Sequence, residues 1–144
     1  GVNNLEEEVA VKEQRRIEIA LKISGLPFIK SIDEFDFTFQ PKLDRQKVMS
    51  LFDLTFIQQH GNVIFLGPPG VGKTHLAVAL GVKAIEHGFG VVFYRLDELL
   101  PMMRRDAELP PAQLRRKKYT NTSLLILDEI GYLPLKSNRP VNPS

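Results

Sequence analysis

The first part of the chain has the hydrophobic periodicity of a helix. Apolar side chains recur there at intervals of three or four positions, as a helix with one buried face requires. They are Leu5, Val9, Ile17, Ala20 and Leu21. Three consecutive glutamates, from Glu6 to Glu8, suit the positive end of a helix dipole. We therefore predict a helix over residues 5–23, which Gly25 and Pro27 end.

Two further segments precede the first predicted strand. Residues 32–39 alternate acidic and aromatic side chains, which suits an extended linker that places its phenylalanine rings on a neighbouring surface. Helical spacing returns after this linker, at Val48, Leu51, Phe52 and Thr55. This spacing predicts a second helix over residues 43–59, which Gly61 ends.

Three short, mainly apolar runs predict strands of a parallel sheet that is covered on both faces. They span residues 62–66, 91–94 and 124–127. A helix predicted over residues 73–87 joins the first two, which gives a right-handed β-α-β unit. Between the second and third runs, Pro101, Pro110 and Pro111 are expected to break the chain into short pieces. The order of elements predicts an α/β fold.

Composition narrows the class of protein further. The chain has 144 residues, of which 43% are hydrophobic and 25% charged, as in one globular domain. The absence of cysteine excludes a disulfide scaffold, a zinc–thiolate site and a thiol nucleophile. No apolar run approaches the roughly 18 residues of a membrane span, and no secretory signal opens the chain. We expect a cytoplasmic protein with no membrane partner.

A glycine-rich sequence, GPPGVGKT, follows the first predicted strand directly. It matches the phosphate-loop pattern G-x-x-x-x-G-K-[ST] in the required setting, between a strand and a helix. Its backbone N–H groups would bind phosphate oxygens, Lys73 would reach the β- and γ-phosphates, and Thr74 would ligate Mg²⁺. The predicted nucleotide-binding residues are Gly67, Pro68, Pro69, Gly70, Val71, Gly72, Lys73, Thr74 and His75. His75 lies inside the helix, where we expect it mainly to pack.

Two carboxylates follow the third predicted strand. Asp128 comes directly after four apolar residues, at the edge of the sheet where a Mg²⁺ ion would lie, and can hold the metal through water. Glu129 is next in sequence and could polarise an attacking water as a general base. The phosphate loop upstream makes nucleotide binding with hydrolysis the expected chemistry of this pair.

Charge is unevenly distributed along the chain, although the formal net charge is only +2. Residues 101–118 contain six basic side chains against two acidic ones. The basic residues are Arg104, Arg105, Arg115, Arg116, Lys117 and Lys118. Such a cluster can neutralise DNA phosphates without reading sequence, and we predict DNA contact here. The alternative is a solvated basic face.

Several motifs together resemble one family. The sequences GPPGVGKTHLAVALG and LLILDEIGYLPL, with SIDEFDFTFQP upstream, are similar to those of the IstB family of ATP-binding transposition helpers. This family belongs to the AAA+ class of P-loop ATPases and is related to bacterial helicase loaders of the DnaC/DnaI type. The resemblance implies a three-layer α/β/α fold around a parallel sheet, preceded by a helical segment.

The resemblance also implies functional roles. Lys73 would act on the phosphates, Thr74 and Asp128 would hold Mg²⁺, and Glu129 would be the catalytic carboxylate. The linker around Phe35 and Phe37 would lie near the nucleotide base; the alternative is that these rings only fill hydrophobic grooves. The implied function is an ATP-binding helper that assembles as a homo-oligomer on DNA and recruits a transposase. The alternatives are a replicative helicase loader and a fragment that binds nucleotide without catalysis.

The resemblance gives provisional boundaries as well. Residues 1–41 would be the end of a helical segment and a linker, 42–135 a partial AAA+ domain, and 136–144 a disordered tail. The family pattern continues after Leu135 to a fourth strand, an arginine-bearing region and a fifth strand, whereas this sequence differs. We therefore expect truncation before the last strands. In the AAA+ sheet the fourth strand separates residues 62–66 from 124–127, so both are expected to keep unpaired edges. Hydrolysis would be inefficient without the arginine.

Overall fold

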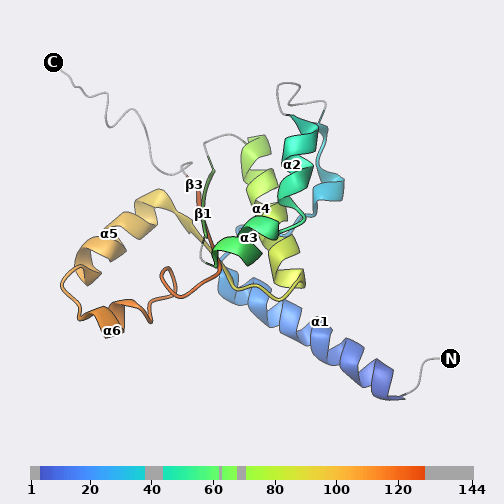
Figure 1. Cartoon of the computed structure of the whole chain (residues 1–144), viewed down its shortest axis with the longest axis horizontal. Coiled ribbons are helices and arrows are strands. Elements are labelled where there is room, and N and C mark those ends of the chain that lie inside the picture. Colours follow the sequence, from blue (N-terminus) through green and yellow to red (C-terminus); the bar gives the residue numbers. More distant parts are fainter. Residues whose placement is uncertain (1–3, 38–43, 62, 68–70, 129–144) are drawn as a thin grey trace.

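The fold of the chain is given by a computed structural model, which describes residues 4–37, 44–61, 63–67 and 71–128 (Figure 1). Its elements in chain order are α1 (Asn4–Ser24), the 3₁₀ turn η1 (Ile32–Glu34), α2 (Arg45–Leu51), α3 (Thr55–His60), β1 (Val63–Gly67), α4 (Val71–Glu86), β2 (Val91–Arg95), α5 (Leu96–Asp106), α6 (Pro111–Leu114) and β3 (Leu124–Asp128). Within these ranges, every helix is too short or too polar to span a bilayer.

The three strands form one parallel sheet in the order β1-β3-β2. Helix α4 connects β1 to β2, and β3 lies between these two strands. In the pairing register, Gly67 and Arg95 are the partners of Asp128 on either side. The carboxyl ends of all three strands therefore meet at one edge of the sheet, where open α/β sheets bind their ligands.

The pairing of β1 with β3 corrects one prediction. We expected these strands to be separated and left with unpaired edges, but they pair directly over five residues, from Val63 with Leu124 to Gly67 with Asp128. Both strands are parallel and of equal length, and their direct pairing satisfies backbone groups that would otherwise lack partners.

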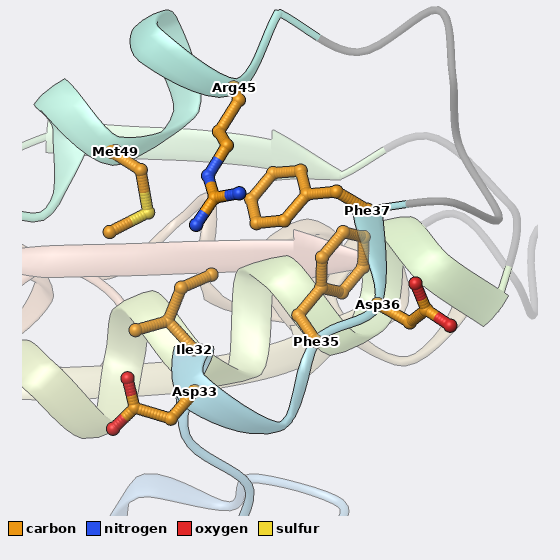
Figure 2. Close-up of a pocket in the computed structure, with 7 residues that line it drawn as sticks. All are labelled: Ile32, Asp33, Phe35, Asp36, Phe37, Arg45 and Met49. Atoms are coloured by element: carbon orange, nitrogen blue, oxygen red, sulfur yellow. The ribbon is translucent and has the colours of Figure 1, made fainter.

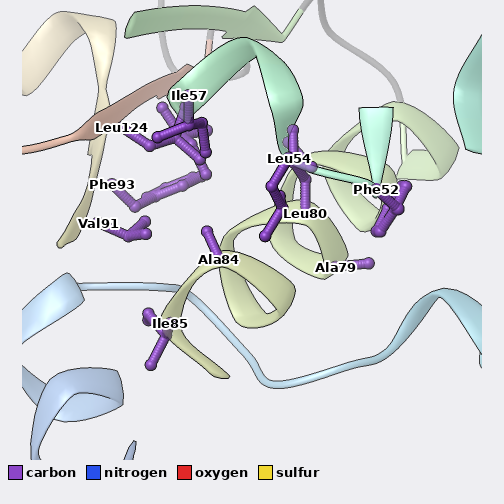
Figure 3. Close-up of a cluster of buried hydrophobic side chains, with 12 residues drawn as sticks. Phe52, Leu54, Ile57, Ala79, Leu80, Ala84, Ile85, Val91, Phe93 and Leu124 are labelled. Atoms are coloured by element: carbon purple, nitrogen blue, oxygen red, sulfur yellow. The ribbon is translucent and has the colours of Figure 1, made fainter. Parts of the chain in front are cut away.

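One face of the sheet is covered by the larger hydrophobic core (Figure 3). Val91 and Phe93 of β2 and Leu124 and Ile126 of β3 point into it, as alternate residues of a strand must. Helix α4 supplies the opposite side of this core and α3 one end of it, through Ala77, Ala79, Leu80, Ala84, Ile85, Leu54 and Ile57. This layer fixes where α4 begins relative to the sheet.

The other face carries a second, smaller cluster. Val92 and Leu125, the intervening strand residues, pack there against Leu99 of α5 and against Tyr119. Helices α4 and α5 thus cover opposite faces of the sheet, and α6 joins α5 on its side through Leu114. The predicted three-layer α/β/α arrangement is confirmed.

The helix expected over residues 43–59 differs from the structure. The single helix expected over residues 43–59 is two helices, because Leu54 adopts a left-handed conformation with φ of 64° between them. This backbone places the Leu54 side chain in the core, where it is 1% exposed. The Asp53 carboxylate accepts a hydrogen bond from the Thr55 N–H at 2.9 Å and starts the second helix.

Pro101 does not break the chain, contrary to the prediction; it lies inside α5. The loss of the backbone N–H at Pro101 is tolerated because α5 is stabilised by a cap at its start and by packing along its inner face. At its start, the Glu98 carboxylate accepts a hydrogen bond from the Arg95 N–H. On its inner face, Leu99 is 1% exposed and Met102 packs on the second cluster.

Only the second half of the predicted apolar face of α1 packs on the core, where its side chains are half-buried. Ile17, Ala20 and Leu21 pack against the larger core, whereas Leu5 and Val9 are 69% and 60% exposed. The buried half is also fixed by a hydrogen bond between the Arg16 guanidinium and the carbonyl of Ile85, at the end of α4. The first turns of α1 therefore project from the body of the molecule (Figure 1).

Candidate functional site

The phosphate-loop motif and the carboxylate that follows the third apolar run meet where the strands of the sheet end. The Thr74 hydroxyl, in the first turns of α4, donates a hydrogen bond to a carboxylate oxygen of Asp128 at 3.3 Å, across 54 positions of sequence. Both residues are buried, at 8% and 5% exposure. A buried carboxylate beside a hydroxyl gives two of the hard oxygen donors that Mg²⁺ prefers. Their chemistry fits the predicted metal.

Of the remaining predicted phosphate-loop residues, the structure describes the backbone of Gly67 and of residues 71–73 near this pair. Gly67 ends β1 directly beside Asp128, and residues 71–73 form the start of α4. Residues 68–70 and Glu129 lie outside the described residues, and so do residues 38–43 of the linker. The 16-residue helix α4 begins at Val71, and the hydrogen bond from Thr74 to Asp128 places its N-terminus at this edge of the sheet. A helix N-terminus favours anions such as phosphate.

His75 joins this helix to the aromatic linker. Its Nε2 lies 3.2 Å from the carbonyl oxygen of Ser31, and its ring meets that of Phe35 edge-on, with ring centres 5.2 Å apart. Its side chain thus packs, as expected. The linker is not wholly extended as predicted, since Ile32–Glu34 forms a 3₁₀ turn. The Glu34 carboxylate accepts a hydrogen bond from the Ser31 N–H and stabilises that turn.

A pocket of about 340 Å³ opens beside the linker (Figure 2). The rings of Phe35 and Phe37 meet edge-on with centres 4.8 Å apart, and the Arg45 guanidinium lies 5.0 Å from the centre of the Phe37 ring. The residues that line it are Ile32, Asp33, Phe35, Asp36, Phe37, Arg45 and Met49. Sequence reasoning missed Arg45 and Met49, because only the packing of α2 against the linker brings them there.

The six predicted DNA-binding residues lie around the ends of α5 and α6. All except Lys117 are exposed. The Lys117 ammonium lies 3.6 Å from the Asp106 carboxylate, which also accepts a hydrogen bond from the Tyr119 hydroxyl at 2.7 Å. The Lys118 ammonium donates a hydrogen bond to the carbonyl of Ile23 at 2.9 Å. The basic cluster is therefore attached to α5 and to the end of α1.

The Tyr119 contact predicts an alkaline loss of stability. The hydrogen bond to Asp106 raises the pKa of Tyr119 to about 12, and burial and the Asp106 charge add to the shift. An unfolded tyrosine ionises near pH 10, so the folded state holds the proton more tightly. We expect the contribution of this hydrogen bond to the free energy of unfolding to be complete below pH 10 and to be lost as the pH rises to about 12.

Thermal unfolding of the wild type and of Tyr119→Phe between pH 8 and about pH 12 measures this effect. The variant should be less stable at neutral pH and should lose less stability across the alkaline range. Equal alkaline losses in the two proteins would show that the Tyr119–Asp106 hydrogen bond does not contribute in solution.

Comparison with known proteins gives a consistent result. The family model described as "IstB-like ATP binding protein" matches residues 3–140. The ATP-binding protein named for insertion sequence IS21 of Pseudomonas aeruginosa is 46% identical over 91% of this chain and 49% of its own length. Those named for IS5376 of Geobacillus stearothermophilus and IS232 of Bacillus thuringiensis subsp. berliner are 40% and 41% identical, over 93% and 89% of this chain. The chain spans about half the length of these relatives.

Proposed function

Because this chain belongs to the IstB-like ATP-binding family, we propose that it binds ATP with Mg²⁺ and assists the transposition of an insertion sequence. The observation that carries the proposal is the hydrogen bond between Thr74 and Asp128, which joins the two motifs at the ligand-binding edge of the sheet. The relatives, which are named as ATP-binding proteins of insertion sequences, support both parts of it.

The phosphate groups of ATP would lie over the start of α4. The non-proline residues of the loop 67–74 would supply backbone N–H groups, and the Lys73 ammonium would neutralise the β- and γ-phosphates. This assignment is supported by the place of residues 71–74 in the first turns of α4 and by Gly67 at the end of β1.

Thr74 and Asp128 would hold the Mg²⁺ ion. When bound, the metal would supply positive charge that neutralises the phosphate groups. Glu129, next in sequence, would orient the attacking water. Its place directly after Asp128 supports this role, because Asp128 ends β3 beside Gly67.

The nucleotide base would enter the pocket beside the linker. Phe35 and Phe37 offer aromatic surfaces, and the contact between Phe35 and His75 ties this pocket to the helix that begins with the phosphate loop. Arg45, whose guanidinium lies against the Phe37 ring, would add a planar cationic group that can stack on a purine ring.

The exposed arginines at the end of α5 and directly after α6 would contact DNA, and a transposase and further copies of the chain would be partners. An insertion-sequence helper is favoured over a helicase loader because the matched relatives are named for insertion sequences. Capture experiments with a transposase and with a hexameric helicase would separate the two functions.

Thermal unfolding with millimolar ATP, with and without Mg²⁺, tests the nucleotide proposal. Binding to the native state stabilises it by about 2.7 kcal/mol at one hundred times the Kd. We expect ATP to raise the Tm and Mg²⁺ to raise it further. In Asp128→Asn the effect of ATP alone should persist while the Mg²⁺ increment is lost.

Glu18→Gln, an exposed charge change on α1, is the control and should behave as the wild type. The absence of any shift with ATP and Mg²⁺ would contradict nucleotide binding. It would favour instead a domain that takes part in transposition without using ATP.

A further inference from the structure

The six basic residues after β2 fall into two sets by their contacts. Lys117 pairs with Asp106, and Lys118 donates to the carbonyl of Ile23. The four arginines are exposed, and no hydrogen bond or ion pair joins their side chains to other described residues. They are Arg104, Arg105, Arg115 and Arg116.

We propose that the four arginines make the phosphate contacts with DNA and that Lys117 and Lys118 are positioning residues that hold this arginine surface in place. The inference rests on the DNA-binding part of the proposed function. It divides a cluster that is uniform in charge into residues with different roles.

The position of Asp106 supports the role of Lys117. An acidic side chain in the last turn of a helix opposes the helix dipole, so Asp106 is unfavourable for α5 taken alone. Its carboxylate is instead used by two groups of the segment after α6, the Tyr119 hydroxyl and the Lys117 ammonium. Its side chain is only 15% exposed, which strengthens both interactions.

The same contact arranges the arginines. Asp106 follows Arg105 in sequence, and Lys117 follows Arg116. The 3.6 Å ion pair between Asp106 and Lys117 therefore holds the backbone that carries the arginine pair at the end of α5 next to the backbone that carries the pair after α6. Met102 of α5 and Leu114 of α6 pack on the same hydrophobic cluster and keep the two helices together.

Lys118 fixes this surface to another element. The carbonyls of the last turn of a helix lack partners within the helix, and the Lys118 ammonium satisfies one of them, that of Ile23 in α1. This interaction connects positions 95 residues apart.

The chemistry of arginine supports the role of the four arginines. Guanidinium groups suit phosphate, because their planar donors can bind two oxygens at once.

Fluorescence anisotropy with a duplex DNA at several salt concentrations tests the division. Each phosphate contact contributes about 0.9 to the slope of log K against log salt. Replacing the four arginines with glutamine should lower the slope by about 3 to 4 and leave the Tm nearly unchanged. Lys117→Gln/Lys118→Gln should keep the slope, lower the Tm and weaken binding at fixed salt by about threefold to tenfold, a loss of about 0.7–1.4 kcal/mol.

Two further variants keep the test decisive. Lys118→Met retains the aliphatic stem and serves if the double lysine variant does not fold, with the same expectation of unchanged slope and weaker binding. Lys117→Arg should bind DNA as tightly as the wild type, in contrast to the glutamine variant, because it keeps the ion pair with Asp106. The control Lys12→Gln/Lys47→Gln removes two exposed charges elsewhere. It should change neither the salt slope nor the DNA affinity at fixed salt.

A slope lowered by about 2 in Lys117→Gln/Lys118→Gln, with an unchanged Tm, would overturn the inference. So would unchanged DNA affinity with only a lowered Tm, which would mark the lysines as purely structural. If the wild type shows no salt-dependent DNA binding, the inference is also overturned. The ATP part of the proposed function is measured separately by the thermal shift and would stand.

Discussion

Lys73→Ala should weaken ATP binding by about 30-fold or more. Hydrogen bonds to charged groups contribute about 1.5–3 kcal/mol, and each 1.4 kcal/mol changes affinity tenfold. The proposed site places this ammonium on two phosphate groups, so its loss removes more than one such bond. Isothermal titration with ATP and Mg²⁺ measures the change. Lys83→Ala, a lysine near the other end of α4, is the matched control and should bind as the wild type.

An unchanged ATP affinity in Lys73→Ala would contradict the phosphate-loop assignment, whatever the thermal-shift result. A loss of equal size in Lys83→Ala would point to general damage of α4 rather than to a phosphate contact. The two lysines share one helix and differ in their distance from the sheet edge, which makes the comparison specific.

Ile126→Ala should reduce the free energy of unfolding by about 3 kcal/mol, within the range for large-to-small core substitutions. Ile126 is fully buried on the central strand β3. Its side chain reaches α4, where a methyl group placed on Gly81 would come within 3.0 Å of its Cδ1. The truncation therefore opens a cavity between the sheet and the helix that carries the phosphate loop. Urea unfolding gives the free energy directly.

Leu5→Ala is the matched control for this prediction. Leu5 is 69% exposed, so its truncation should change the free energy of unfolding by about 0.5 kcal/mol or less. Similar losses in the two variants would mean that the packing of β3 against α4 differs in solution. A large loss in Leu5→Ala alone would indicate that the projecting end of α1 is covered by another molecule.

Much of the fold follows from local sequence pattern. The apolar runs located all three strands to within one residue at each end, and the glycine-rich turn after the first marked the start of α4. Patterns of this kind are reliable because a strand buried on both faces and a helix with one buried face must each repeat apolar residues at their own period.

Other features depend on contacts between distant residues. Pro101 indicated a break, but Leu99 and the Glu98 cap keep α5 continuous. The helical spacing around Phe52 gave no sign of the left-handed Leu54, whose side chain is buried in the core by contacts with distant residues. Lys117 and Lys118 looked like part of one basic run, and their partners come from α5 and α1.

The sequence by itself determined the class of fold, the two motifs of the candidate nucleotide site and the family, because each is written in residues that are close together in the chain. Only the tertiary structure decided that β1 pairs with β3, that Thr74 meets Asp128, and which basic side chains have internal partners. All three strands are short and apolar, so nothing in their composition selects a neighbour. That choice is made by how the helices pack on the two faces of the sheet, a property of the whole chain.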